Sequence, residues 1–253
     1  MSDDVVFRLD RVSYAYPDGH VALAEATFEL RAGESVCLLG ANGCGKSTLL
    51  RLLDGLAFPA SGEARAFGQP LAPATLEDEA FSREFRRRVA LLFQDPDAQL
   101  FSPTVGDDVA FGPLQVGLPR EEVEGRVADA LRLCSAEGLS SRLPHTLSGG
   151  EKKRAALAAL LALDPSVLLL DEPFAGLDPR GQVWLQELIA SLRERGRTIV
   201  SATHDLDCVE GIAERAIVLS EDHRIAADGP AKAILADRDL LLRVNLIHER
   251  WRR

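Results

Sequence analysis

The chain has 253 residues, 46% of them apolar, and a formal net charge of −10 at pH 7. This composition excludes a disordered chain and allows one large domain with a hydrophobic core. Because an acidic protein gains little from releasing counterions on nucleic acid, the charge also argues against a nucleic-acid partner. Three short basic clusters, at 86–88, 152–154 and 250–253, are interpreted as parts of solvated faces.

The sequence predicts neither a membrane span nor a secretion signal. Its first ten residues are acidic and lack an apolar stretch. No uncharged apolar run approaches the roughly 18 residues that a membrane helix needs. The four cysteines show neither metal-binding spacing nor a disulfide pattern, which fits a reducing compartment. If the protein works at a membrane, we expect another chain to span it.

The first part of the chain is expected to begin with an antiparallel hairpin. Residues 5–12 and 21–30 alternate apolar and polar side chains around the turn YPDGH. The continuous apolar run 35–40 is typical of a buried parallel strand, and the segment from 46 to Gly55 predicts a helix directly after it. A polar region rich in proline and glycine follows, and a further strand is predicted at 89–93.

The second part is expected to alternate helices with buried strands. Residues 104–135 are predicted to be mostly helical, interrupted at Pro113 and Pro119, and a helix is predicted at 151–163. Three apolar runs predict three more strands: 166–171, 197–203 and 215–220. Helical patterns lie between them, so the sequence predicts an α/β fold built on a parallel sheet.

The first chemical motif is GANGCGKS at 40–47, a G-x4-G-K-S loop between a predicted strand and a predicted helix. Its glycines let successive backbone N–H groups face phosphate oxygens. In such a loop Lys46 reaches the β- and γ-phosphates and the Ser47 hydroxyl binds Mg²⁺. Arginine is the usual cation of this chain, which has only four lysines among 29 basic residues. A lysine in the loop therefore favours a site for a compact point charge.

The second motif is VLLLDEP at 167–173, in which a buried strand ends in Asp171 and Glu172. The strand would deliver both carboxylates to the C-terminal edge of the sheet, where ligands of α/β proteins bind. We expect Asp171 to hold Mg²⁺, through Ser47 or a water molecule, and Glu172 to polarise the attacking water.

The order and spacing of GANGCGKST, LSGGEKKR, VLLLDEP, GLDP and TH resemble the nucleotide-binding subunit of ATP-binding cassette (ABC) transporters, from about residue 5 to about 235. This resemblance implies a P-loop NTPase fold of the ABC type: an antiparallel β subdomain with a parallel-sheet core (about 5–93 and 164–235), a helical signature subdomain (about 95–163) and a C-terminal helical tail (about 236–253). It implies hydrolysis of ATP, with ATP and Mg²⁺ bound together.

The resemblance also assigns site residues. Tyr16 would stack on adenine, in preference to Tyr14. Gln94 would sense Mg²⁺ and the attacking water, and His204 would contact the γ-phosphate and orient Glu172. The predicted phosphate loop consists of Asn42, Gly43, Cys44, Gly45, Lys46, Ser47 and Thr48.

In the family, two subunits meet head to tail. The resemblance therefore implies that Ser148, Gly149 and Gly150, at a predicted helix start, bind the nucleotide held by a second ATPase subunit, either a copy or a paralogue. Asp178 would lie in the loop that crosses this interface. Glu151 replaces the family's usual glutamine. We expect its side chain to point outward, because an inward acid would be repelled by phosphate whereas an acid in the first turn suits the helix dipole.

Residues 94–113, QDPDAQLFSPTVGDDVAFGP, resemble the ATPases of energy-coupling-factor importers, especially those for cobalt and nickel. The implied partners are a transmembrane coupling protein and a small substrate-binding membrane protein, and the implied location is the cytoplasmic face of the cell membrane. Five apolar residues would line a groove for a helix of the coupling protein: Leu100, Phe101, Val105, Val109 and Phe111. Core packing in the helical subdomain is the alternative for all five, and it is weighted most for Val109 and Phe111.

The transported ion is not expected to bind this chain, because its five histidines are scattered and only Mg²⁺ is expected here. The alternatives are an ATPase of a vitamin-importing energy-coupling-factor transporter and a soluble ABC ATPase of iron–sulfur assembly. A DNA-repair ATPase is disfavoured because 49–146 holds no coiled-coil or zinc insertion, and a GTPase because no N-K-x-D motif occurs.

Cys44 lies between two glycines of the phosphate loop. Backbone N–H groups, a helix start and Lys46 would surround it with positive potential, so we expect a lowered thiol pKa and a reactive thiolate. The alternative is that any small residue fits there.

Overall fold

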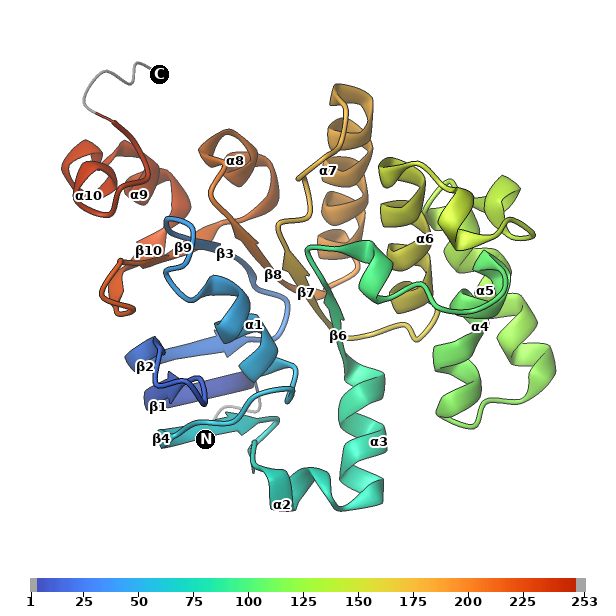
Figure 1. Cartoon of the computed structure of the whole chain (residues 1–253), viewed down its shortest axis with the longest axis horizontal. Coiled ribbons are helices and arrows are strands. Elements are labelled where there is room, and N and C mark those ends of the chain that lie inside the picture. Colours follow the sequence, from blue (N-terminus) through green and yellow to red (C-terminus); the bar gives the residue numbers. More distant parts are fainter. Residues whose placement is uncertain (1–3, 249–253) are drawn as a thin grey trace.

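The structure is a computed structural model that describes residues 4–248 and contains two sheets (Figure 1). The smaller sheet is antiparallel, in the order β2-β1-β4-β5. Its strands are β1 (Val5–Ala15), β2 (Val21–Arg31), β4 (Ser61–Ala66) and β5 (Gln69–Pro70). The predicted hairpin is therefore confirmed, whereas β4 and β5 were not predicted.

The larger sheet has the order β10-β9-β3-β8-β7-β6. Five of its strands run parallel: β3 (Ser35–Leu39), β6 (Val89–Leu92), β7 (Val167–Asp171), β8 (Thr198–Thr203) and β9 (Arg215–Leu219). Almost every residue in them is buried, which explains their continuous apolar sequences. The predicted parallel-sheet core is confirmed. The edge strand β10 (Ile225–Pro230), antiparallel to β9, was not predicted.

Two hydrophobic clusters cover opposite faces of the larger sheet. One joins the antiparallel sheet and α1 (Lys46–Leu53) to one face. The other joins the opposite face to α4 (Val105–Gln115), α5 (Arg120–Leu133), α6 (Gly149–Leu161), α7 (Pro179–Glu194), α8 (Val209–Ile212), α9 (Ala231–Ala236) and α10 (Arg238–Arg243). Helices α4 to α6 form a lobe beside β6, on the right of Figure 1. Short 3-10 turns cover Pro96–Ala98, Glu137–Leu139, Pro144–Thr146 and Leu206–Cys208.

One expectation for the helices was wrong, and two helices were missed. Pro113 does not interrupt the helix but lies in the last turn of α4. Its missing N–H removes a single helical hydrogen bond, the one to the Val109 carbonyl. The polar region before β6 contains α2 (Pro73–Leu76) and α3 (Glu79–Arg88). Helix α3 buries only Phe85, so it shows almost no apolar periodicity.

Residues 249–253, which include the whole third basic cluster, lie outside the described residues. The part of the predicted C-terminal tail that is described contains α10. Within residues 4–248, no helix combines the length and the apolar character needed to cross a membrane.

Candidate functional site

The phosphate loop connects the end of β3 to the start of α1. Gly45 directly precedes the helix with φ +111°, and a Cβ atom there would lie 2.1 Å from the carbonyl oxygen of Ala22. Only glycine meets both demands. The loop thereby directs the N-terminal end of α1, with its unpaired N–H groups, toward the adjacent cavity.

A cavity of about 390 Å³ lies over this loop. It brings together ten residues that the sequence predicted for one nucleotide: Tyr16, Asn42, Gly43, Gly45, Lys46, Ser47, Thr48, Gln94, Glu172 and His204. They come from the phosphate loop and the start of α1, and from the residues that follow β1, β6, β7 and β8. The candidate nucleotide site therefore lies at the carboxyl edge of the parallel strands, where ligands of α/β proteins bind.

Lys46 is buried at the base of the cavity. Its ammonium group donates to the carbonyl oxygens of Gly40 (2.7 Å) and Ala41 (3.2 Å) and lies 3.8 Å from Oε1 of Glu172. These acceptors hold a positive charge at the point where the loop N–H groups converge, which suits an anionic group.

Ser47 and Asp171 are in contact: the Ser47 hydroxyl donates to Oδ1 of Asp171 at 3.0 Å. Burial raises the pKa of Asp171, although the bond from Ser47 opposes this shift. A hydroxyl, a carboxylate and the amide of Gln94, which lines the same cavity, are the hard oxygen donors that Mg²⁺ prefers. Residues 4–248 contain no cluster of three or more His, Cys, Asp or Glu side chains suited to a metal. A cation here would therefore also need oxygens from the substrate or from water.

Glu172 is buried and has an unusual backbone, with φ +45°. Its N–H group donates to the carbonyl of Ala202 (2.9 Å). Its carboxylate accepts from the Thr203 hydroxyl at Oε2 (3.3 Å) and lies 2.9 Å from Nδ1 of His204 at Oε1. The His204 side chain is 54% exposed. A carboxylate held in this way, with an open side toward the cavity, can accept a proton from water.

Tyr16 and Tyr14 occupy different environments. The Tyr16 hydroxyl is 2.8 Å from Oγ1 of Thr48, and its ring lines the cavity. The Tyr14 ring meets Tyr16 edge-on at 5.2 Å and packs on the hydrophobic cluster. Sequence reasoning missed His20, whose ring is nearly parallel to that of Tyr16 and lines the same cavity. Its only signal was its place at the end of the YPDGH turn.

The expectation for Cys44 was wrong. Its side chain is buried in the cluster beneath the loop, close to Gly40, and does not face the cavity. Burial raises the pKa of the thiol more than Lys46 and the backbone N–H groups lower it. Cys44 therefore offers the site its backbone only, and the small-residue interpretation fits the structure better.

Ser148, Gly149 and Gly150 lie apart from this cavity, at the start of α6, which stands across the sheet from α1 (Figure 1). Ser148 is exposed and caps α6. Asp178 is exposed and caps α7, accepting from the Gly181 N–H at 2.7 Å. One chain thus holds two groups of predicted nucleotide-binding residues in separate places.

The outward orientation expected for Glu151 was also wrong. Its Oε2 accepts from the N–H (2.8 Å) and the hydroxyl (2.9 Å) of Ser148, and its Oε1 accepts from Arg142 (2.7 Å). The bonds from Ser148 lower the pKa of Glu151. The reason is the capping box, in which a residue at the third helical position bonds back to the cap.

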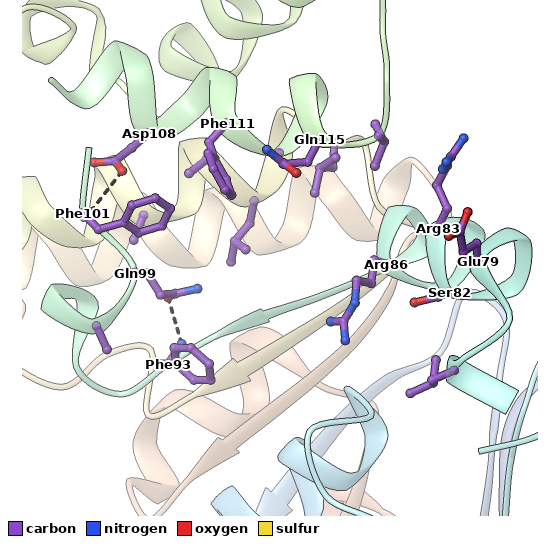
Figure 2. A pocket seen from close by; sticks show the side chains of 18 of the residues that line it. Glu79, Ser82, Arg83, Arg86, Phe93, Gln99, Phe101, Asp108, Phe111 and Gln115 are labelled. Carbon is purple, nitrogen blue, oxygen red and sulfur yellow. Dashed lines mark hydrogen bonds between the residues drawn. The ribbon is translucent and has the colours of Figure 1, made fainter. Parts of the chain in front are cut away.

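A second cavity, of about 620 Å³, lies between α3 and the helical lobe (Figure 2). Phe101 and Phe111 line it with exposed rings 4.9 Å apart. We call this cavity the aromatic groove. Leu100, Val105 and Val109 do not line it, because they are buried in the core. Their predicted role in the groove was wrong, and core packing holds for Val109 but not for Phe111.

Helix α3 forms the opposite wall of the aromatic groove. Because the sequence did not predict this helix, it did not predict the wall either. The residues that α3 contributes are Glu79, Ser82, Arg83 and Arg86. Asp108 also lines the groove and is 4% exposed. Its Oδ1 accepts from the N–H groups of Phe101 (3.1 Å) and Ser102 (2.8 Å), whereas Oδ2 is buried without a hydrogen-bond partner among residues 4–248.

The sequence profile of ABC transporters matches residues 23–175. This chain belongs to the ABC transporter family. It is an ATP-binding ATPase of that family, and the predicted fold class is confirmed by solved ABC ATPases.

Two curated relatives cover almost all of this ABC ATPase. The nickel import ATP-binding protein NikO of Rhodobacter capsulatus is 50% identical over 95% of each chain. The energy-coupling factor transporter ATP-binding protein EcfA of Methanocaldococcus jannaschii is 44% identical, over 92% of this chain and 82% of its own length.

Two solved structures share the fold. CbiO1 of Clostridium perfringens, part of the ABC transporter complex CbiONQ, has a TM-score of 0.81 and 36% identity, over 96% of this chain and 95% of its own. A dimeric ATP-binding cassette in a post-hydrolysis state with ADP and Pi has a TM-score of 0.80 and 27% identity, over 89% of this chain and 98% of its own.

Proposed function

We propose that this ABC ATPase powers the import of cobalt or nickel ions through an energy-coupling-factor transporter, at the cytoplasmic face of the cell membrane. The aromatic groove is the observation that carries the proposal, since it leaves two phenylalanine rings open for a partner. The names of NikO and CbiO1 and the segment 94–113 support this transporter type. Vitamin import is the alternative, because the name of EcfA specifies no metal.

The groove suits a helix of a transmembrane coupling protein. Phe101 and Phe111 offer apolar contact area, and α3 adds polar side chains on the other wall (Figure 2). A coupling helix that brings apolar side chains to the phenylalanines and polar side chains to α3 matches both walls of the groove.

In the chemical step, Lys46 and the loop N–H groups hold the phosphates of ATP. Ser47, Asp171 and Gln94 would hold Mg²⁺, which would neutralise phosphate charge when bound. Glu172 accepts the proton of the attacking water as general base, and His204 orients Glu172 through the 2.9 Å contact. The ring of Tyr16 stacks on adenine.

The separation of Ser148, Gly149 and Gly150 from the cavity supports a head-to-tail dimer. Each signature segment then binds the nucleotide that the second subunit's Lys46 holds, and Asp178 lies at the same interface. The test mixes a Lys46→Ala chain with a Ser148→Arg chain, each inactive alone. Mixing should restore one intact composite site and part of the ATPase activity. ATP-driven dimerisation is measured in parallel, and a mixture that dimerises but stays inactive contradicts the trans assignment.

The transport proposal is tested on the complex isolated from membranes. The tagged chain should retain a transmembrane coupling protein and a small membrane protein, identified by mass spectrometry, and vesicles with this complex should take up cobalt or nickel when ATP is supplied. Uptake of a vitamin instead would establish the alternative. Isolation with soluble scaffold proteins alone would indicate iron–sulfur assembly. Phe101→Ala with Phe111→Ala should release the membrane proteins, whereas Val183→Ala, an exposed apolar residue on α7, should not.

A further inference from the structure

Three consecutive basic residues of α6 reach three different segments. The ammonium group of Lys152 lies 2.6 Å from Oδ1 of Asp97, and the guanidinium of Arg154 lies 4.4 Å from the centre of the Trp184 ring. Lys153 points into the protein between them. Successive residues of a helix diverge by about 100°, so three neighbours face three directions. The interpretation of 152–154 as a solvated basic cluster was therefore wrong.

Lys153 is 3% exposed, and burial lowers its pKa, although Glu172 opposes this shift. A buried ammonium group needs close acceptors. Here its Nζ donates to the carbonyl oxygens of Ala175 (2.7 Å) and Glu172 (3.4 Å). Both acceptors belong to one short turn directly after β7, which the Ala175 N–H closes by donating to the Glu172 carbonyl at 3.1 Å.

The turn that Lys153 contacts determines where the Glu172 carboxylate lies. Glu172 has a left-handed backbone, which a residue with a side chain keeps only where its surroundings fix it. Its N–H group is held by the Ala202 carbonyl and its own carbonyl by Lys153 and the Ala175 N–H. Among these contacts, Lys153 is therefore the one side chain that holds the turn, and it does so from α6.

We propose that Lys153 is a positioning residue for ATP hydrolysis: it holds the turn 172–175 so that the Glu172 carboxylate faces the cavity. This inference rests on the proposed role of Glu172 as general base. It links the helix that begins at the signature segment to the catalytic carboxylate of the same chain.

The first test compares Lys153→Met with Lys152→Met in the full chain. Methionine keeps the length of the side chain and removes its donors. Lys153→Met should lower kcat about 10- to 100-fold while the Kd for ATP and the melting temperature stay close to those of the unmodified chain. Lys153→Arg, which keeps the charge and donors, should recover part of kcat. Lys152→Met, on the same helix, should leave kcat within about twofold.

An unchanged kcat in Lys153→Met overturns the proposal. A loss of kcat that accompanies equal losses of ATP affinity and melting temperature also overturns it, because that result indicates a merely structural anchor. Glu172→Gln is measured alongside. If that variant hydrolyses ATP normally, the base assignment fails independently of what Lys153→Met shows.

Mixed dimers separate an effect on Glu172 from an effect on the signature segment. In Lys153→Met with Glu172→Gln, the remaining site uses the Glu172 of the Lys153→Met chain, so activity should fall relative to unmodified chain with Glu172→Gln. In Lys153→Met with Ser148→Arg, the remaining site uses only the signature segment of the Lys153→Met chain. Its activity should equal that of unmodified chain with Ser148→Arg. The reverse pattern would show that Lys153 acts through the signature segment and overturn the proposal.

Discussion

The Nδ1 atom of His204 lies 2.9 Å from Oε1 of Glu172, although the two residues directly follow different strands of the parallel sheet. The parallel pairing of β7 with β8 creates this contact, because Asp171 pairs with Ala202 and the chain leaves both strands at the same edge. The pair therefore depends on sheet register, and a substitution of either side chain tests the site without disturbing the sheet.

Glu172→Gln should keep ATP binding and lower the rate of hydrolysis by about 10²–10⁴-fold, because an amide fills the same space but cannot accept the proton. An ATP-bound dimer should accumulate. Steady-state turnover, ATP binding and size-exclusion chromatography with ATP measure the three effects. Glu187→Gln, an exposed acid on α7, is the matched control, and near-normal turnover of Glu172→Gln would refute the assignment.

His204→Ala should lower kcat by roughly 10- to 100-fold through the loss of orientation of Glu172 and of a γ-phosphate contact. His145→Ala, an exposed histidine in a short 3-10 turn, should leave kcat unchanged. Measurement of kcat and KM for both variants checks this expectation. If His204→Ala raised KM alone, the residue would bind ATP without orienting the base.

Glu151→Gln should lower the ATP concentration needed for dimerisation by about two- to tenfold. The glutamine keeps the capping box but removes the negative charge from the Ser148 hydroxyl, where the proposed dimer brings a phosphate. High salt should shrink the difference by screening. Glu121→Gln, in the first turn of α5, serves as control. Weaker dimerisation of Glu151→Gln would show that the carboxylate assists the signature segment.

Asp54 makes folding stability depend on pH. It caps the C-terminal end of α1, and burial raises its pKa to about 7 against the opposing effect of Arg86. The folded state therefore binds the proton more tightly than the unfolded chain does, and stability falls as pH rises from about 4 to about 7. Asp54→Asn should stabilise the protein by about 1–2 kcal/mol at pH 8 and hardly at pH 4. Thermal unfolding at both pH values measures this, and an equal shift at both would contradict the sign.

Cys44 should react slowly with iodoacetamide in the native protein, because its thiol is buried and its pKa is raised. Labelling followed by mass spectrometry should show rapid modification only after unfolding, and Cys44→Ala should remain an active ATPase. Rapid native labelling that Mg-ATP prevents would instead restore the picture of a reactive thiolate in the phosphate site.

The strands of the larger sheet and the phosphate loop could be predicted because physics leaves few alternatives there. A strand buried on both faces must be apolar throughout, and Gly45 has no room for a side chain. Helix α3 could not be predicted, because its nearly continuous polar sequence carries one buried side chain, Phe85. Strand β10 could not be predicted either. Its residues alternate only between partly buried and exposed, and Asp228 and Gly229 are residue types typical of turns.

Side-chain directions were harder to predict than positions. Lys153 and Glu151 stand on one turn of α6 in a stretch rich in charge, and sequence alone placed both side chains in solvent. Tertiary neighbours decided otherwise: two carbonyl groups accept from Lys153, and Ser148 and Arg142 turn Glu151 back toward the helix start. Cys44 was misjudged for the same reason, since positive potential along the backbone does not reveal where a small side chain packs.

Phe93 and Gln94 are consecutive residues that line different cavities. Phe93 lines the aromatic groove, and Gln94 lines the cavity over the phosphate loop. A bond from the Phe93 N–H to Oε1 of Gln99 (3.0 Å) holds this junction. The ligands proposed for these two cavities must obey thermodynamic reciprocity. If a ligand of the groove changes the affinity for nucleotide by some factor, nucleotide changes the affinity for that ligand by the same factor. Measuring either change therefore gives the coupling free energy between the two cavities.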